Sequence, residues 1–541
     1  MVPLLLSPAL FVSGSWFAVA RPPLTESAGS RRAASITVEG ADRRRYGPMM
    51  TILSPTSAGH LGWETGPVTT PRTGARHVVV VGGGIAGLAA ARFLTRDGPR
   101  DLRVTVLESS SEVGGKLRVS EVAGVAVDEG AESLLLRRPE GVDLARSVGL
   151  GEDLEDAATT SAAVWTRGAM HPMPSGTVMG VPGDLRSLAA TGLLTGRELS
   201  RLPLDAWLPR TEIGEDVSVG RYVRARLGRG VLDRLVEPLL GGVYAGRADQ
   251  LSLEATLPAL APHARRERSL LAAVRASRSG APVSDAAVFG APRGGLGRLP
   301  AAVARASGAS IRTGVTVREL ARTPDGWRLA VGPTASPEEV LADAVILAVP
   351  ASAAARLLRP HLPAAASELA QIRYASVAVV ALAFPVAAFP VAPSGSGFLV
   401  PPVDGRAVKA VTFSSSKWGW YAGAAPGLAV LRASVGRIGE EQILQREDSE
   451  LVDLVLADLS DALGVADPPL GVRVTRWGGS LPQYAVGHRA RVERVRSSVA
   501  TARGLAVCGA AYDGVGVPAC VATAERAAGE VLGRWPATMT P

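Results

Sequence analysis

Three glycines and one acidic residue are the groups whose types and spacing are best suited to chemistry in this sequence. Gly82, Gly84 and Gly87 have the G-x-G-x-x-G spacing, which permits a tight turn, close approach of the backbone to a pyrophosphate and close packing of the next helix. Glu108 lies 21 residues beyond Gly87, near the offset at which a carboxylate accepts hydrogen bonds from a ribose. An acid there disfavours a 2′-phosphate, so the pattern predicts a dinucleotide site and argues against NADP.

The elements that must position these residues form a strand–helix–strand unit. The valine-rich run 77–81 predicts a buried parallel strand, residues 88–94 have a helical pattern, and residues 102–107 predict a second strand. The free amides at the start of the helix attract an anion. A structural glycine turn in an α/β protein is the alternative, and the glycines alone fit either NAD or FAD.

Two segments that follow the second strand carry a resemblance to a known family. Glu112-Val113-Gly114-Gly115-Lys116 and Val127-Asp128-Glu129-Gly130-Ala131-Glu132-Ser133 resemble the second and third FAD contacts of the amine oxidase and protoporphyrinogen oxidase superfamily. In that superfamily the flavin stays fixed and substrates come to it. The FAD-binding residues that the fingerprint and this resemblance together imply are Gly82, Gly83, Gly84, Ile85, Ala86, Gly87, Glu108, Gly114, Gly115, Lys116, Gly130, Ala131, Glu132 and Ser133.

Later segments resemble the remaining pieces of the same cofactor domain. Residues 311–320 look like the strand whose valine backbone faces the adenine, and Val317 best fits that position. Residues 342–350 predict another buried strand, and residues 505–520 resemble the closing flavin motif, whose helix points its amino terminus at the isoalloxazine. The contacts implied in the closing motif are Val515, Gly516 and Val517.

The attachment of the cofactor can also be read from the closing motif. Some relatives bind FAD through a cysteine just before a tyrosine, but here Ala511 precedes Tyr512. The sequence therefore predicts non-covalent FAD. The cysteines Cys508 and Cys520 are too few for a disulfide framework, and we expect both to be small buried hydrophobic residues in a reducing compartment.

The order of the motifs predicts an α/β fold whose cofactor domain is interrupted twice, and the length of 541 residues fits two or more domains. We expect a discontinuous, Rossmann-like FAD-binding domain, a mostly helical insert, and a substrate-binding domain of mixed sheet and helices. The predicted ranges are 77–150, 289–350 and 500–535 for the FAD-binding domain, 151–288 for the helical insert and 351–499 for the substrate-binding domain.

The net charge of +8 first suggests a nucleic-acid or membrane partner. Residues 1–76 contain eight arginines and four acids, or +4, which leaves only +4 for the rest of the chain. No basic run interleaved with aromatics follows, so nucleic-acid binding is not expected. The six histidines show no metal-ligand cluster, and no metal is predicted.

The first 76 residues form a low-complexity leader. Residues 3–20 are apolar but lack a positively charged start, and Met49 and Met50 precede the fingerprint, so a disordered or overextended start is preferred to a cleaved signal. The apolar stretch 374–393 contains prolines and alternates like a strand, so no transmembrane segment is predicted. We expect a cytoplasmic protein; peripheral membrane contact and the oligomeric state stay open.

Segments within the two inserts narrow the resemblance to porphyrinogen oxidases, closest to the Gram-positive bacterial coproporphyrinogen III oxidase type. These segments are 235–246, 409–418, 431–437, 476–477 and 481–488. The resemblance implies oxidation of coproporphyrinogen III to coproporphyrin III in heme biosynthesis, reduction of dioxygen to hydrogen peroxide, and transfer of the product to a ferrochelatase. Protoporphyrinogen IX oxidation is the first alternative, flavin amine oxidation a more distant one, and a flavin protein without turnover is a third.

Few polar residues can be given roles in substrate binding. Arg137 and Arg138 follow the third flavin segment and could bind propionates bidentately, or they could be a solvated surface pair. His488 is predicted to be a structural histidine beside Tyr484, and Tyr512 could form one wall of an amine-guiding aromatic cage. No catalytic acid or base is assigned.

Overall fold

A five-stranded parallel sheet carries the glycine turn. The computed structural model describes residues 76–279 and 287–533, so the leader predicted over residues 1–76 lies, except for Arg76, outside the described residues. The strands run in the order β12-β2-β1-β16-β22, and every neighbouring pair is parallel. The strand order reverses beside β1, as in doubly wound nucleotide-binding sheets. The strands are β1 (His77–Val81), β2 (Arg103–Leu107), β12 (Ser310–Arg312), β16 (Ala344–Leu347) and β22 (Leu505–Val507).

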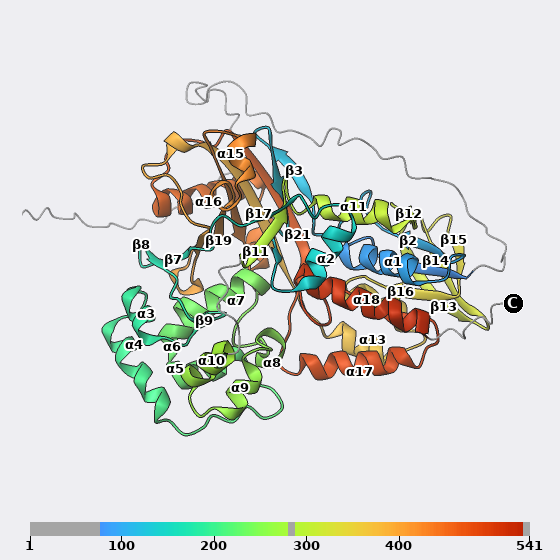
Figure 1. The fold of residues 1–541 in the computed structure, drawn as a ribbon, viewed down its shortest axis with the longest axis horizontal. Helices are drawn as coiled ribbons and strands as arrows, with labels where there is room; N and C mark the ends of the chain where they lie inside the picture. Colours follow the sequence, from blue (N-terminus) through green and yellow to red (C-terminus); the bar gives the residue numbers. More distant parts are fainter. Residues whose placement is uncertain (1–75, 280–286, 534–541) are drawn as a thin grey trace, which may run out of the picture. The chain divides into compact units, whose positions relative to one another are not determined.

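Both faces of this sheet are buried, which explains the unbroken valine run of β1. Val78 and Val80 pack with α1, α11 and α18, whereas Val79 and Val81 pack on the other side with α12, α13 and α17. Helices α1 and α18, far apart in sequence, lie side by side in Figure 1. The helices are α1 (Ile85–Asp97), α11 (Arg298–Ser307), α12 (Ala351–Leu358), α13 (Pro363–Ala370), α17 (His488–Ala500) and α18 (Val517–Gly533).

A seven-stranded mixed sheet is formed mainly by the segment predicted to be the substrate-binding domain. Its order is β21-β17-β20-β19-β18-β7-β8, and only the β7–β18 pair is parallel. Helix α16 (Asp448–Leu463) packs on one face. The strands are β7 (Ala162–Thr166), β8 (Ala169–Pro172), β17 (Tyr374–Pro385), β18 (Gly397–Leu399), β19 (Val408–Phe413), β20 (Leu428–Val435) and β21 (Gly471–Pro482).

The structure differs from the predicted ranges where inserts join neighbouring sheets. Strands β7 and β8 come from the insert expected to be mostly helical, yet they extend the seven-stranded sheet. Helices α12, α13 and α17 come from the two ends of the predicted range 351–499, yet they cover the parallel sheet. The apolar stretch predicted to alternate like a strand contains β17, and no helix in the described residues is long and apolar enough to cross a membrane.

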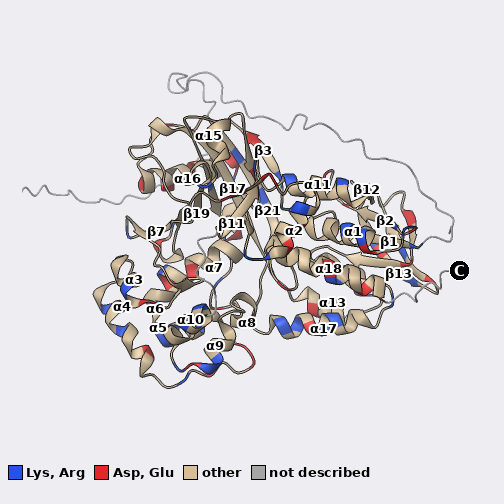
Figure 2. Cartoon of the chain, in the orientation of Figure 1, with Lys and Arg blue, Asp and Glu red and all other residues tan. Residues whose placement is uncertain are grey.

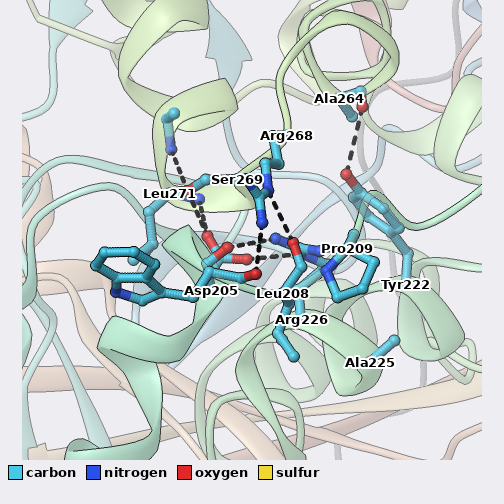
Figure 3. Close-up of polar contacts among 12 residues, drawn as sticks. Asp205, Leu208, Pro209, Tyr222, Ala225, Arg226, Ala264, Arg268, Ser269 and Leu271 are labelled. Carbon is cyan, nitrogen blue, oxygen red and sulfur yellow. Dashed lines mark hydrogen bonds and ion pairs between the residues drawn. The ribbon is translucent and has the colours of Figure 1, made fainter.

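The rest of the first insert is a group of short helices around a buried ion pair (Figure 3). The guanidinium of Arg226 donates to Asp205 Oδ1 at 2.7 Å and to the Pro209 carbonyl at 2.6 Å, and both charged side chains are almost fully buried. Asp205 Oδ2 also accepts from the Leu271 amide at 3.0 Å, which ties the start of α10 to this pair. The helices are α3 (Leu185–Ala190), α4 (Gly196–Arg201), α5 (Val219–Leu227), α6 (Arg229–Val231), α7 (Glu237–Tyr244), α8 (Leu253–Thr256), α9 (Ala261–Arg266) and α10 (Leu270–Ser279).

Smaller elements connect these parts. Strands β3 and β4 form a hairpin, β5 and β6 flank β11, β9 pairs with β10, and β13, β14 and β15 form an antiparallel sheet. Helix α2 packs against α18, and α14 and α15 follow β19. Their bounds are β3 (Val119–Val122), β4 (Val125–Asp128), β5 (Leu134–Leu135), β6 (Leu154–Asp156), β9 (Thr177–Val178), β10 (Val181–Pro182), β11 (Phe289–Pro292), β13 (Val317–Thr323), β14 (Gly326–Val331), β15 (Glu338–Ala342), α2 (Pro139–Ser147), α14 (Ser414–Lys417) and α15 (Trp420–Ala424).

Candidate cofactor and substrate cavity

One cavity of about 790 Å³ joins the glycine turn to the seven-stranded sheet. It opens at the carboxyl ends of β1 and β2, beside the point where the strand order reverses, which is where doubly wound folds bind their ligands. Its volume is within the usual range for small-molecule sites. The sequence-predicted residues that line it are Gly82, Gly84, Ile85, Ala86, Glu108, Gly114, Gly115, Lys116, Gly130, Ala131, Ser133, Val317, Val515, Gly516 and Val517.

Each glycine of the turn is needed for a different physical reason. Gly82 has a φ of +106°, and a Cβ at Gly87 would lie 1.9 Å from the Gly82 carbonyl oxygen, so the helix can approach the strand only with glycine there. A Cβ at Gly84 would meet no atom within 4 Å, because this position faces the cavity. Gly83 and Gly87 do not line the cavity. The turn therefore leaves open backbone at Gly84, as close approach of a pyrophosphate requires.

Glu108 is held in place at the mouth of this turn. Its Oε2 accepts a hydrogen bond from the Gly83 amide at 2.6 Å, and its Oε1 accepts one from the Ser110 amide at 2.8 Å. A carboxylate has about four lone-pair sites, so acceptor capacity remains on the side that lines the cavity. The carboxylate is thus preorganised to accept from neighbouring hydroxyl groups.

The second predicted segment lies directly against the turn. The Gly114 amide donates to the Gly83 carbonyl at 2.9 Å, and Gly114 and Gly115 both have positive φ values. Lys116 lines the cavity, and burial lowers the pKa of its ammonium. Gly130 packs on this segment so closely that a Cβ there would lie 1.9 Å from the Lys116 carbonyl oxygen.

The closing segment brings the amino terminus of α18 to the cavity. Val515, Gly516 and Val517 line it, so the positive end of the helix dipole faces the space. Cys520 also lines the cavity, and burial raises the pKa of its thiol to about 11. Cys508 and Cys520 are free and buried, which confirms the prediction that they pack as small hydrophobic residues.

Glu132, predicted as an FAD contact, does not itself line the cavity. Its side chain is buried, and Oε1 accepts from Lys417 Nζ at 2.7 Å while Oε2 accepts from Arg432 at 2.5 Å and from Ser414 Oγ at 3.1 Å. The two cations hold the pKa of Glu132 at about 2, despite the opposing effect of burial. Glu132 thus orients Arg432, which does line the cavity.

The two arginines predicted to bind propionates also lie elsewhere. Arg137 and Arg138 are exposed and do not line the cavity, and Arg138 forms an ion pair with Glu140 at 2.5 Å. They match the surface-pair interpretation that the sequence left open. His488 stacks on Tyr484 with a ring separation of 4.1 Å, which confirms its predicted place beside that tyrosine.

Residues that sequence reasoning did not assign form the far wall of the cavity. Strands β17, β19, β20 and β21 and helix α7 present a face on which Lys409 and Arg432 are the cations. Both belong to segments that resemble porphyrinogen oxidases. Only the register of the sheet, however, shows that both side chains face the same cavity. Tyr512, expected as a wall of an amine cage, is buried in an apolar cluster and does not line the cavity. The wall residues are Gly242, Val243, Tyr374, Val377, Val379, Lys409, Ala410, Thr412, Arg432, Ser434, Trp477, Gly478, Gly479, Ser480 and Leu481.

Helix α17 is another place where basic residues cluster visibly (Figure 2). Arg491 and Arg494 form ion pairs with Glu368, and Arg496 forms one with Asp513. Carboxylates therefore neutralise much of the positive charge of this helix. Within the part of the chain that the structure describes, no group of three or more His, Cys, Asp or Glu residues is placed to hold a metal ion.

Comparison with known proteins identifies a flavin-containing family, in agreement with the dinucleotide cradle. Residues 85–532 match the family described as flavin containing amine oxidoreductase. The coproporphyrinogen III oxidase of Bacillus subtilis is 34% identical over 85% of this chain and 98% of its own length. That of Mycobacterium bovis is 38% identical over 84% of this chain and 97% of its own length. A crystal structure of a candidate protoporphyrinogen oxidase from Exiguobacterium is 34% identical, with a TM-score of 0.74 over 85% of this chain and 99% of that one.

Proposed function

Because the chain belongs to the flavin-containing amine oxidoreductase family, we propose that it is an oxygen-dependent FAD oxidase that converts coproporphyrinogen III into coproporphyrin III in heme biosynthesis. The observation that carries the proposal is the cavity that joins a dinucleotide cradle to a wall bearing Lys409 and Arg432. Two coproporphyrinogen III oxidases that match this chain over nearly their whole lengths support the substrate class.

The cradle fits FAD on several counts. Gly84 leaves open backbone for the pyrophosphate, Glu108 has acceptor capacity for ribose hydroxyls, and Val317 lines the same cavity. The amino terminus of α18 faces the cavity and would favour negative charge on the isoalloxazine ring. These residues would hold the cofactor.

We also propose that FAD is bound without a covalent bond. Ala511 stands before Tyr512, and burial keeps the thiol of Cys520, which lines the cavity, protonated at neutral pH. Acid precipitation of the purified yellow protein should leave FAD in the supernatant. Flavin retained in the washed precipitate would contradict non-covalent binding.

The chemistry asks the chain mainly to position the macrocycle and exclude water. When bound, FAD would supply a two-electron acceptor that dioxygen reoxidises with release of hydrogen peroxide. Aromatising a porphyrinogen removes three electron pairs, each with two protons, so three dioxygen molecules become three hydrogen peroxide molecules. The pyrroles themselves supply the electronic push. The wall residues of β17, β19 and β20 therefore need only hold a bridge carbon in place.

Two alternatives are testable against this function. Protoporphyrinogen IX, with two propionates and two vinyls, is favoured by the similarity to the Exiguobacterium protein. Amine oxidation would require an aromatic cage, but Tyr512 does not line the cavity. Tyr374 and Trp477 do line it, although the Trp477 indole donates to the Glu129 carbonyl at 2.9 Å. We place the activity in the cytoplasm, with coproporphyrin III passing to a ferrochelatase.

The deciding experiment offers the holoenzyme each substrate separately. Coproporphyrinogen III, protoporphyrinogen IX and a panel of amines are incubated aerobically, while porphyrin fluorescence and hydrogen peroxide are recorded. The proposal predicts the highest kcat/KM for coproporphyrinogen III and no peroxide from the amines. Consumption of both porphyrinogens no faster than autoxidation would refute it, and faster use of protoporphyrinogen IX would favour the first alternative.

A further inference from the structure

Lys409 is turned toward the cavity by an irregularity in β19. Val408 pairs with Val435 and Ala410 pairs with Ser434, so Lys409 is the extra residue of a β-bulge. Val408 packs in the apolar cluster on one side of the sheet, whereas Lys409 and Ala410 line the cavity on the other. Bulges of this kind redirect side chains beside functional sites. The bulge thus places a cation on the substrate wall.

The ammonium of Lys409 has little compensation from the protein. Its side chain is buried at 3% exposure, and Nζ donates to the Ser434 hydroxyl at 2.5 Å. Among the described residues, no carboxylate lies within ion-pair distance of it. Burying an ammonium with a neutral hydroxyl as its partner is costly, so an anion in the cavity would be stabilised there.

The charges around Lys409 leave a positive excess. Two charged side chains act on it: Arg437 repels the ammonium, and Glu440 attracts it. Glu440 already accepts from Arg437 at 3.3 Å and from Arg247, so one carboxylate serves two guanidiniums. Glu237 is a second carboxylate beside these arginines. It accepts a hydrogen bond from a backbone amide, and burial raises the pKa of its carboxyl group. Burial and Arg437 lower the pKa of Lys409 to about 7.

From the bulge, the buried ammonium and the surplus of cations, we propose that Lys409 receives a carboxylate of the substrate and thereby selects a porphyrinogen with four propionates over one with two. The inference rests on the proposed function and assigns its specificity to one residue. A vinyl group in the same place would leave the ammonium without an anion, whereas a propionate would replace the hydration that burial removes. Arg432, already bound to Glu132, remains a positioning residue for the wall.

The test compares kcat/KM on coproporphyrinogen III and protoporphyrinogen IX for the wild type, Lys409→Met and Lys409→Arg. Lys409→Met should lower kcat/KM for coproporphyrinogen III by about 10- to 100-fold, mainly through KM, and change that for protoporphyrinogen IX by less than about threefold. Lys409→Arg should restore most of the preference. Arg494→Gln, which removes a surface cation bound to Glu368, is the matched control and should leave both values unchanged.

Equal losses on both substrates, with FAD content retained, would overturn the role of Lys409. If the wild type oxidises neither porphyrinogen, the proposed function fails first and the inference falls with it. If the wild type prefers coproporphyrinogen III and Lys409→Met keeps that preference, only the inference fails.

A measurement on the unsubstituted holoenzyme guards against poor folding of Lys409→Met. Coproporphyrin III, with four propionates, should bind more tightly than deuteroporphyrin IX, with two, by about tenfold or more. At about pH 8, above the Lys409 pKa of about 7, binding of coproporphyrin III should take up a proton, seen by calorimetry in buffers of different ionisation enthalpy. Equal affinities and no proton uptake would overturn the inference without any variant.

Discussion

Replacing Glu132 by glutamine should destabilise the fold more than any surface change of the same kind. The carboxylate is buried and is shared by Lys417 at 2.7 Å and Arg432 at 2.5 Å, so two cations from α14 and β20 depend on it. Glutamine keeps the size of the side chain but removes its charge. Both cations would then remain buried without their anion.

The size of the expected loss of stability follows from the pKa of Glu132. The ion pairs lower it from 4.5 to about 2 in the folded protein, and a shift of ~2.5 units corresponds to about 3 kcal/mol of stability. Because the folded-state pKa is the lower one, this stabilisation is fully present above about pH 4.5 and is lost as the pH falls toward about 2. Breaking buried ion pairs typically costs about 3–5 kcal/mol, which agrees with this value.

The assay is urea unfolding of the FAD-loaded protein near neutral pH, followed by tryptophan fluorescence and flavin release. Glu132→Gln should lower the unfolding midpoint by an amount equivalent to about 3 kcal/mol. The double variant Glu132→Gln/Lys417→Met should lose less than the sum of its two single variants. Glu140→Gln, which breaks the exposed pair with Arg138, is the control and should cost less than about 1 kcal/mol. Equal midpoints for Glu132→Gln and Glu140→Gln would refute the reasoning.

Three further predictions concern the cradle and the helical insert. Glu108→Ala should weaken FAD binding by about 1–3 kcal/mol in titrations of the apoprotein, and unchanged affinity would remove Glu108 from the site. Gly84→Val should lower FAD content while the apoprotein keeps its thermal stability, because its side chain enters open space; Gly87→Ala, which collides with the Gly82 carbonyl, should lower that stability too. Equal effects of the two substitutions would contradict the assignment of Gly84. Asp205→Ala should cost about 3–5 kcal/mol in unfolding experiments and leave FAD affinity unchanged; a fall in affinity would show that the buried pair with Arg226 also supports the cofactor site.

The cofactor cradle could be predicted from the sequence because its residues lie close together along the chain. Gly82, Gly84 and Gly87 follow one strand and open one helix, so their spacing determines their geometry without knowledge of the rest of the chain. Val317 and Val515 could be assigned only through resemblance, since each belongs to a separate segment. The structure brings all of these except Gly87 to the wall of one cavity.

The substrate wall could not be predicted from the sequence in this way. Glu132 meets Lys417 and Arg432 across sequence separations of 285 and 300 residues, so the motif that contains it could not show that its carboxylate turns away from the cavity. Lys409 faces the cavity because of a bulge whose register no sequence period encodes. Arg137 was assigned from its nearness to a flavin segment, and the structure leaves it exposed.

The stoichiometry of one aerobic reaction tests the proposed oxidation of coproporphyrinogen III most directly. Purified holoenzyme is mixed with coproporphyrinogen III, and coproporphyrin III and hydrogen peroxide are measured together against an enzyme-free control. Coproporphyrin III should form well above the rate of autoxidation, with three peroxide molecules for each porphyrin and no turnover without dioxygen. Formation of coproporphyrin III at the rate of the control, by protein that carries its full complement of FAD, would contradict it.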